Sequence, residues 1–343
     1  MVDELVTEGL EAGRSADDYQ QLVAQAIAAA EPTDEGLMRA LRLLRQKEMV
    51  RIAWRDLAGL AEVEPVLHEL SDFAEAIIVQ TLDHLYQQTT EVLGIPTSAE
   101  GEAQQMLVLA MGKLGGRELN YSSDIDLIFA YAEQGSTEGG RHLSNHEFFV
   151  RLAGKLVRLL DEITQDGFVF RVDTRLRPNG DSGPLAMNFN AMEQYYQLQG
   201  RDWERYAMIK ARILGGKEAD RKYLASMLRP FTYRRYLDFG AFESIREMKG
   251  MIEAEVRRKS MKDNIKLGSG GIREIEFIGQ TFQLIRGGPM PELQVRSILT
   301  VLSLLADFGY LGQDEAEELR QSYLFLRKLE NRLQMERDQQ TQT

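Results

Sequence analysis

Cysteine is absent from the 343-residue sequence, and histidine occurs only four times. A chain without cysteine forms no disulfide bonds and offers no thiolate to a metal ion, which fits the reducing cytoplasm, where we expect this protein. With so little histidine, metal binding must depend mainly on carboxylates, and these suit Mg²⁺ or Mn²⁺ better than Zn²⁺. His142 and His146 lie four residues apart without a further ligand close by, so we interpret them as an exposed helix start.

Long apolar runs are absent as well. No stretch approaches the roughly 18 uninterrupted apolar residues that a membrane-spanning helix needs. The acidic start Met1-Val2-Asp3-Glu4 also lacks the basic-then-apolar plan of a signal peptide. We therefore expect no membrane partner. Hydrophobic residues make up 43% of the chain and charged residues 27%, which is typical of globular domains, and the length predicts two or three of them.

Positive charge is in short supply. The 41 lysines and arginines are outnumbered by 53 aspartates and glutamates, which gives a net charge of -12. Proteins that bind nucleic acid usually present a basic face to the phosphate backbone. The acidic balance does not forbid a local basic cleft, but it disfavours DNA or RNA as a partner.

Helices are predicted for residues 1–97. Pro32-Thr33-Asp34 has the composition of a helix start after a loop. Apolar residues recur at spacings of three and four, as on the buried face of a helix. Glycine and proline in Gly94-Ile95-Pro96-Thr97-Ser98 mark the first boundary. The apolar residues that set the pattern are Leu37, Leu41, Leu44, Leu70, Phe73, Ala74, Ile77, Ile78, Leu82 and Leu85.

A different pattern follows this boundary. Three short apolar runs, at 106–111, 125–131 and 168–173, predict strands. Between the second and the third run, Ser144 and Glu147 form the capping-box signature of a helix start. The region is therefore predicted to be a mixed α/β unit. The apolar face of its helix comprises Phe148, Phe149, Leu152, Leu156, Leu159 and Leu160.

Helical periodicity returns in the last third of the chain. The predicted fold class is therefore α+β, with a small mixed sheet and its helices at 98–215. A helical region at 1–97 precedes this unit, and a C-terminal helical domain at 216–343, truncated at its end, follows it. The C-terminal helices are predicted from two apolar faces, Val301, Leu304, Leu305 and Phe308, and then Leu319, Leu326, Leu329 and Leu333.

Three aspartates carry the chemistry that we predict. Asp124 and Asp126 stand at alternate positions where the second predicted strand begins, so both side chains point to the same side. Neighbouring carboxylates repel each other, and a divalent cation between them reverses that interaction. Asp173 ends the third predicted strand. If that strand lies beside the second, the three carboxylates meet at one edge and can hold two Mg²⁺ ions that grip a phosphoryl group.

A glycine-rich turn precedes the aspartate pair. Gly112, Gly115 and Gly116 let the backbone approach a phosphate chain, and Lys113 is a candidate for contacting the phosphates, with a solvated turn as the alternative. Neither this turn nor Asp-x-Asp is specific by itself. Their order, with a strand, the glycine turn, the aspartate pair and then a strand ending in aspartate, favours metal-dependent phosphoryl chemistry.

Other polar residues are candidates for binding the nucleotide or phosphate. Arg175 and Arg177 follow Asp173 at alternate positions and can bind a phosphate bidentately, while a surface ion pair is the alternative. Hydroxyl groups can donate to phosphate oxygens or serve only the turn before the strand. In a predicted helix, basic residues can contact the ligand or take part in packing. The hydroxyl candidates are Ser122 and Ser123, and the basic helix candidates are Arg205 and Lys210.

These segments resemble a known family. The arrangement resembles the nucleotidyltransferase superfamily that includes DNA polymerase beta, and more closely bacterial glutamine synthetase adenylyltransferase. The resemblance extends from about residue 35 to the end of the chain. In the superfamily the glycine turn usually lies further from the aspartate pair than Gly115-Gly116 does here, so the glycine that contacts phosphate stays open. The blocks that carry the resemblance are residues 112–131, 171–178, 200–212 and 264–277.

The resemblance implies a polymerase beta-like nucleotidyltransferase fold and a specific reaction. The family attaches AMP to a tyrosine of glutamine synthetase and removes it, with two related catalytic halves, in the regulation of nitrogen assimilation. This chain resembles the adenylyl-removing half, which implies phosphorolysis that gives ADP and unmodified glutamine synthetase. Asp124, Asp126 and Asp173 would bind Mg²⁺ or Mn²⁺. The implied partners are adenylylated glutamine synthetase, adenine nucleotide, phosphate and, through a longer full-length enzyme, the PII signalling protein.

Three alternatives stay open at this point. The chain could transfer the adenylyl group from ATP onto a protein tyrosine instead of removing it. It could be an enzyme of the same fold that acts on nucleic acid, although the acidic balance disfavours this. It could also be a non-catalytic regulatory module, although such a module would not need all three carboxylates.

Overall fold

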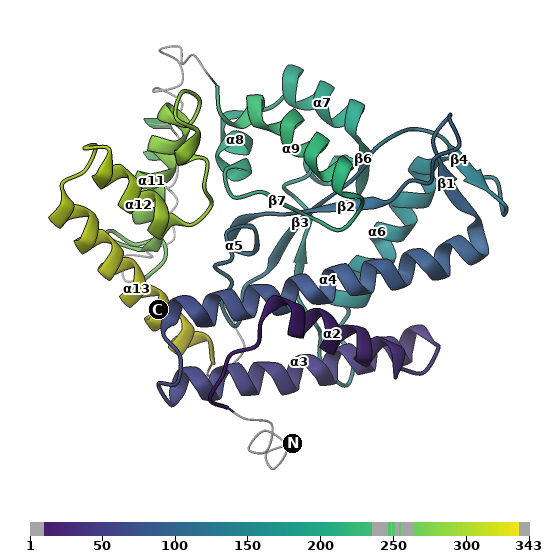
Figure 1. Ribbon diagram of the computed structural model, residues 1–343, viewed down its shortest axis with the longest axis horizontal. Helices are drawn as coiled ribbons and strands as arrows, with labels where there is room; N and C mark the ends of the chain where they lie inside the picture. Colours follow the sequence, from purple (N-terminus) through teal and green to yellow (C-terminus); the bar gives the residue numbers. More distant parts are fainter. Residues whose placement is uncertain (1–9, 235–245, 248, 251–253, 255–263, 336–343) are drawn as a thin grey trace. The chain divides into compact units, whose positions relative to one another are not determined.

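The computed structural model describes residues 10–234, 246–247, 249–250, 254 and 264–335 (Figure 1). The chain forms two compact units. The first comprises residues 1–119, 123–195 and 212–225, and the second comprises 120–122, 196–211 and 226–343. The N-terminal helices and the sheet thus fall in the same unit, and the boundaries proposed at 97 and 215 stay predictions. None of the helices in the described ranges has the length and apolarity needed to cross a membrane.

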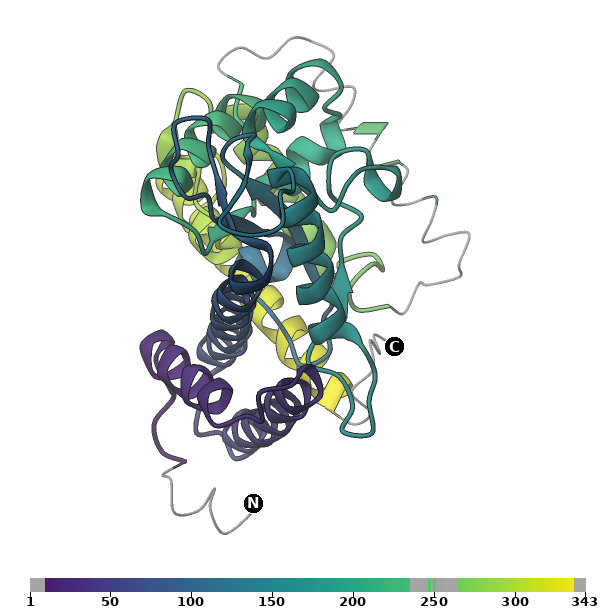
Figure 2. The ribbon, with the colours of Figure 1, turned by 90° about the vertical axis from the view of Figure 1, so that its right-hand side faces the viewer.

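Three helices open the first unit, and Figure 2 draws them in purple to slate blue. Thr33 caps the second of them, where the sequence predicts a helix start, and its side chain accepts from the Gly36 N–H. The apolar residues predicted to face inward are buried in the structure, with Leu41, Leu70 and Phe73 fully covered. The helices are α2 (Ala16–Ala28), α3 (Asp34–Leu57) and α4 (Val63–Leu93).

Buried charges join these three helices. Glu69 of α4 accepts hydrogen bonds from Arg51 and Arg55 of α3, and Tyr19 of α2 donates to the same carboxylate at 3.2 Å. Arg51 also donates to Glu48 at 2.8 Å. Because a buried charge is costly unless it is paired, this network fixes how the helices pack.

A small mixed sheet forms the centre of the first unit. Its strands follow the order β5-β3-β2-β7, and β6 pairs with the other end of β3. The pairs β2–β3 and β2–β7 are antiparallel, whereas β5 and β6 run parallel to β3. The α+β fold class predicted from the sequence is confirmed. The strands are β2 (Met106–Ala110), β3 (Ile125–Tyr131), β5 (Val172–Asp173), β6 (Ala186–Asn188) and β7 (Arg212–Leu214).

The predicted helix between β3 and β5 is confirmed. It is α6 (Asn145–Asp161), and its N-cap Ser144 forms the full capping box with Glu147. The six apolar residues predicted for its inner face are all buried. Shorter elements complete the unit, namely β1 (Ile95–Thr97) paired with β4 (Ser136–Glu138), α5 (Gly112–Gly115), η1 (Gly180–Ser182), α7 (Phe189–Leu198) and α9 (Glu218–Thr232), of which α7 and α9 run past its limits.

The third predicted strand is shorter than expected. The sequence predicts a strand over 168–173, but only Val172 and Asp173 form one. The backbone N–H groups of Val169 and Phe170 both donate to the carbonyl of Leu160, at 2.9 and 3.0 Å. These two N–H groups therefore bond the end of α6 instead of a neighbouring strand. Only Val172 and Asp173 pair with the sheet.

The second unit contains a helical core. Ile272, Leu293, Val301, Leu305 and Tyr323 are buried together in it. The elements are α8 (Asp202–Met208), α11 (Ile272–Arg286), η2 (Pro291–Leu293), α12 (Ile298–Asp307) and α13 (Gln313–Met335).

The face predicted for the last helix is correct only in part, because Leu319 and Leu326 pack against the core of this unit. Leu319, Leu326, Leu329 and Leu333 of α13 are only half-buried. The buried face is turned by about one residue, roughly 100° around the helix axis. Most of it is polar, because it consists of Ala316, Tyr323, Arg327, Glu330, Asn331 and Gln334.

Candidate active site

Strand pairing brings two of the predicted aspartates face to face. β3 and β5 run parallel, and Asp126 lies directly opposite Asp173 in their register. The backbone N–H of Ile125 donates to the carbonyl of Arg171 at 2.9 Å, which extends the pairing toward Asp124. Residues opposite each other on neighbouring strands point to the same side of a sheet. The strand pairing on which the predicted carboxylate cluster depends is therefore present, and the shared metal site itself stays a prediction.

Burial along β3 shows which side is the core. Ile125 and Leu127 are fully buried, whereas Asp124 and Asp126, which alternate with them along the chain, are partly exposed. The alternation follows directly from the pleat of a strand. The acidic side chains thus occupy the solvent-facing side, while the apolar ones anchor the strand beneath them.

A glycine lies against the carboxylate of Asp126. A Cβ atom on Gly112 would stand 2.9 Å from Asp126 Oδ2, and Gly112 has a φ of +53°. A side chain at this position would be strained and would also push the carboxylate away. The Met111 N–H donates to the Asp126 carbonyl at 2.9 Å, so the turn is tied to the strand. The predicted glycine turn and the aspartate pair therefore meet.

The turn itself is the short helix α5. Within it, the N–H of Gly115 donates to Met111 O at 3.0 Å, and the Gly116 N–H donates to Gly112 O at 3.1 Å. Arg212 of β7 donates to the carbonyls of Leu114 and Gly115 at 3.1 and 3.2 Å. These bonds satisfy carbonyl groups at the end of the turn and hold it beside the sheet. Lys113 lies at the second position of this turn, and the carbonyl of Lys113 accepts from Glu118 N–H at 2.7 Å.

Asp173 is held by an arginine two residues away. Arg175 Nε lies 3.0 and 2.9 Å from the two oxygens of Asp173, and the Arg175 backbone N–H donates at 2.8 Å. These hydrogen bonds, which outweigh the effect of burial, hold the pKa of the Asp173 carboxyl below its usual value. The hydrogen bonds to Asp173 in turn raise the pKa of the Arg175 guanidinium, and the charge of Asp126 makes a smaller contribution in the same direction.

Asp124 is held by a second arginine. Arg171 Nε donates to Asp124 Oδ1 at 2.7 Å. The guanidinium of Arg171 lies over the ring of Phe168 at 5.3 Å, and Arg45 of α3 lies over the same ring at 4.8 Å. Cation–π contacts of this kind restrict the arginine side chain. The Phe168 ring therefore helps to hold Arg171 in the position from which it bonds Asp124.

The chemistry of the donors fits a hard divalent cation. Asp124, Asp126 and Asp173 offer only carboxylate oxygens, the ligands that Mg²⁺ and Mn²⁺ prefer. Across the described ranges, however, no three histidine, aspartate or glutamate side chains converge closely enough to form a metal site. The oxygens of Asp124 and Asp173 instead accept from Arg171 and Arg175. A metal ion would therefore compete with these two guanidinium groups.

The other predicted ligand residues have various surroundings. Arg177 is 8% exposed, and its guanidinium donates to Thr174 O at 2.8 Å and to Gly183 O at 3.2 Å. These bonds stabilise the loop in which Arg177 itself lies. In the second unit, Arg205 donates to Phe231 O at 3.1 Å and Lys210 bonds Glu276 at 2.7 Å. Their roles in ligand binding, and those of Ser122 and Ser123, stay predictions.

A family model decides the relationship of this chain. The model described as glutamate-ammonia ligase adenylyltransferase matches residues 1–226 of the 343. The chain belongs to this family. Residues 246–343 match a second model, described as GlnD PII-uridylyltransferase. The family resemblance seen in the sequence is thus confirmed.

A curated relative agrees with this assignment. Over 311 residues the chain is 60% identical to the bifunctional glutamine synthetase adenylyltransferase/adenylyl-removing enzyme of Nitrosococcus oceani. The match covers 90% of this chain and 32% of that relative, so the chain spans about a third of the length of the relative.

Arg171 is the site residue that the sequence reasoning missed. It lies two positions before Asp173, so the alternation of the strand places it on the same side as that aspartate. This spacing, together with the strand pairing, would have predicted that the positive charge of Arg171 lies beside the carboxylate of Asp124.

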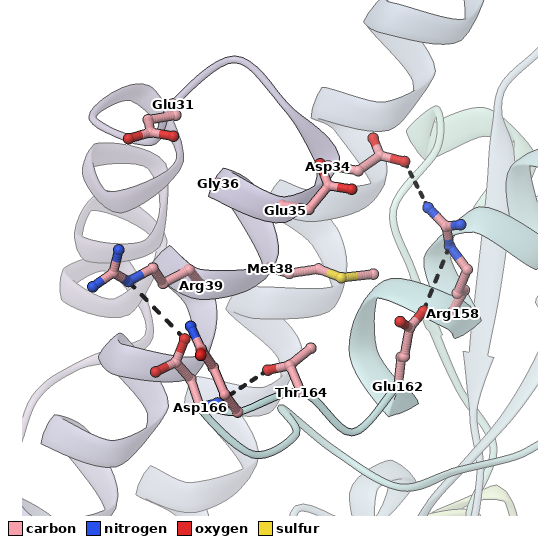
Figure 3. A pocket seen from close by; sticks show the side chains of 11 residues that line it. Glu31, Asp34, Glu35, Gly36, Met38, Arg39, Arg158, Glu162, Thr164 and Asp166 are labelled. Atoms are coloured by element: carbon pink, nitrogen blue, oxygen red, sulfur yellow. Dashed lines mark hydrogen bonds and ion pairs between the residues drawn. The ribbon is translucent and has the colours of Figure 1, made fainter.

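A separate cavity of about 420 Å³ lies in the first unit, between α3, the end of α6 and the loop at 164–166 (Figure 3). Its walls carry ion pairs, such as Arg158–Asp34 at 2.6 Å and Arg39–Asp166 at 4.0 Å. None of the predicted site residues lines it, and we assign it no part in the site.

Proposed function

We propose that this chain removes AMP from the adenylyl-tyrosine of glutamine synthetase by metal-dependent phosphorolysis, and so produces ADP and the unmodified protein. The observation that carries the proposal is the register of β3 and β5, which sets Asp126 opposite Asp173. The name of the Nitrosococcus oceani relative supports the substrate, since it includes both adenylyl transfer and adenylyl removal. The PII signalling protein is a proposed partner of the full-length enzyme.

The reaction balances without a redox partner. An oxygen of inorganic phosphate forms a bond to the phosphorus of the AMP group, and the bond from that phosphorus to the tyrosine oxygen breaks. The tyrosine leaves as a phenolate, whose pKa of about 10 makes it a tolerable leaving group, and it then takes a proton from water. Catalysis therefore needs positioning and charge neutralisation more than covalent chemistry.

The residues of the first unit suit these tasks. Asp124, Asp126 and Asp173 would hold Mg²⁺ or Mn²⁺, which when bound neutralises charge on the transferred phosphoryl group. Arg175 is 72% exposed at its side chain, so its guanidinium can leave Asp173 and bind the incoming phosphate. Gly112 keeps the backbone close to Asp126 without a side chain between them.

The direction of the reaction is tested by its product. With Mg²⁺, phosphate and adenylylated glutamine synthetase, we expect ADP, and we expect no ADP when phosphate is omitted. Asp126→Asn should abolish the release. Asp307→Asn, an exposed aspartate at the end of α12, serves as the control and should leave the rate unchanged.

Other products would identify the alternatives. Pyrophosphate formed from ATP and unmodified glutamine synthetase would show that the chain adds AMP. Salt-dependent binding of labelled oligonucleotides would indicate a nucleic-acid enzyme of the same fold. An Asp126→Asn variant that releases ADP as fast as the natural chain would contradict the proposed role of the carboxylates in catalysis.

A further inference from the structure

The segment between the glycine turn and Asp124 is buried although it forms neither helix nor strand. Asn120 and Ser122 in this segment each expose 1% of their surface. Buried backbone N–H groups need acceptors, and here side chains provide them. Ser71 Oγ of α4 accepts from the Leu119 N–H at 3.0 Å. Gln334 Oε1 of α13 accepts from the Ser122 N–H at 3.1 Å.

The second of these contacts lies within the second unit. Residues 120–122 belong to that unit together with α13, whereas the chain on either side of them belongs to the first. Gln334 stands 212 residues away from Ser122 in the sequence, so only tertiary structure joins them. Asp124 follows Ser122 after a single residue, so the backbone that Gln334 contacts leads directly to Asp124.

The side of α13 that carries Gln334 is polar and buried. Arg327 and Glu330 are fully covered and form an ion pair at 3.0 Å, and Asn331 and Gln334 are each 1% exposed. Apolar residues of similar volume are often neutral or stabilising in such places. Packing alone therefore does not account for the amide at position 334, but its hydrogen bond to the backbone does.

We propose that Gln334 is a positioning residue, which fixes the backbone at Ser122 and thereby sets the place of Asp124. This inference rests on the proposed adenylyl-removing function. Gln334 does not touch the reacting atoms. Its carboxamide oxygen accepts from the Ser122 N–H and so restrains the backbone of residues 120–122, which leads into β3.

The variant Gln334→Met tests this role because it removes the acceptor and keeps the length of the side chain. A misplacement of about 1 Å can cost about a hundredfold in rate, so we expect kcat for ADP release to fall about tenfold or more. KM for phosphate should stay within about twofold, because Arg175, the residue proposed to bind the incoming phosphate, is untouched. The control is Gln321→Met on the exposed side of the same helix, where the carboxamide donates to Glu317. It should leave both constants unchanged.

Hydrogen exchange reads the same contact independently of activity. In the natural chain the Ser122 amide should exchange about a hundredfold or more slower than a free peptide, since it is buried and bonded. In Gln334→Met the Ser122 amide should lose this protection, while Val108 and Phe129 in β2 and β3 keep theirs. This measurement requires no substrate, and the natural chain alone supplies the first half of it.

The outcomes separate the two proposals. A natural chain that protects Ser122 but releases no ADP would reject the proposed function and leave the contact intact. An unprotected Ser122 amide in the natural chain would overturn the role of Gln334. So would Gln334→Met with unchanged kcat, or with protection lost equally at Val108 and Phe129, because either result reduces Gln334 to a packing residue.

Discussion

Asp126 and Asp173 lie directly opposite each other on two parallel strands, at the point where β5 adds only two residues to the sheet. Directly opposed like charges destabilise a sheet unless something compensates for them. In this structure the compensation comes from Arg175, which holds Asp173. The proposed function assigns the same task to a divalent cation during the reaction.

Gly112→Ala should impair activity because of its neighbour. The new Cβ would stand 2.9 Å from Asp126 Oδ2, and the positive φ adds strain of about 1 kcal/mol or more. We expect ADP release to fall about tenfold or more, as a displaced carboxylate would cause. Gly101→Ala is the matched control, since Gly101 also has a positive φ, of +83°, but faces open space. It should lose similar stability in urea unfolding and keep its activity.

Arg171→Gln should lower activity with little effect on stability. The substitution removes the donor that holds Asp124 Oδ1 at 2.7 Å, and a partly exposed ion pair contributes about 0–1 kcal/mol. We expect a loss of about tenfold in kcat, with a shift of the unfolding midpoint no larger than that of Arg158→Gln. Arg158 forms an exposed pair with Asp34, so it provides the comparison. Equal activities of the two variants would contradict the role of Arg171.

Removal of Arg175 should change the titration of Asp173. The pKa of this carboxyl lies below its usual value because of the hydrogen bonds from Arg175. A depressed pKa in the folded state means that the contact stabilises the fold above the ordinary carboxyl pKa of about 4, and that this contribution is lost as the pH falls through the folded-state pKa. Arg175→Gln should therefore raise the pKa of Asp173, which carbon-detected NMR of the carboxyl group measures. An unchanged titration would show that the pairing is absent in solution.

Glu69→Ala should destabilise the first unit. The substitution leaves Arg51 and Arg55 of α3 buried without the carboxylate that both contact. Breaking a buried pair of this kind costs about 3–5 kcal/mol, which urea unfolding would show as a lower midpoint. Glu91→Ala is a suitable control, because Glu91 is exposed near the end of the same helix. If both variants unfold at the same urea concentration, the network does not stabilise the helices.

Regular patterns made part of this fold predictable. The apolar run 125–131 became β3 with the same bounds, and Ser144 with Glu147 located the start of α6. Both signals are local, since a strand or a capping box is encoded in a few adjacent residues. The convergence of Asp126 and Asp173 needed one further step, the pairing of two predicted strands, and the structure confirms that pairing.

Tertiary contacts made the remainder unpredictable. Val169 and Phe170 have strand-like residues around them, but their N–H groups bond the end of α6. Lys210 donates a hydrogen bond to Glu276, which lies 66 residues further along the chain. Nothing near Lys210 in the sequence indicates that partner. The buried face of α13 is polar, so a search for apolar periodicity selected its leucines instead.

Binding of Mn²⁺ in the presence of ADP, followed by electron paramagnetic resonance, tests the carboxylate site most directly. The natural chain should bind the ion, and Asp126→Asn and Asp173→Asn should each weaken binding about tenfold or more, as expected when one ligand of a shared site is lost. Asp307→Asn should bind as the natural chain does. Equal Mn²⁺ affinity in all four proteins would contradict the account, because the two opposed aspartates would then hold no ion.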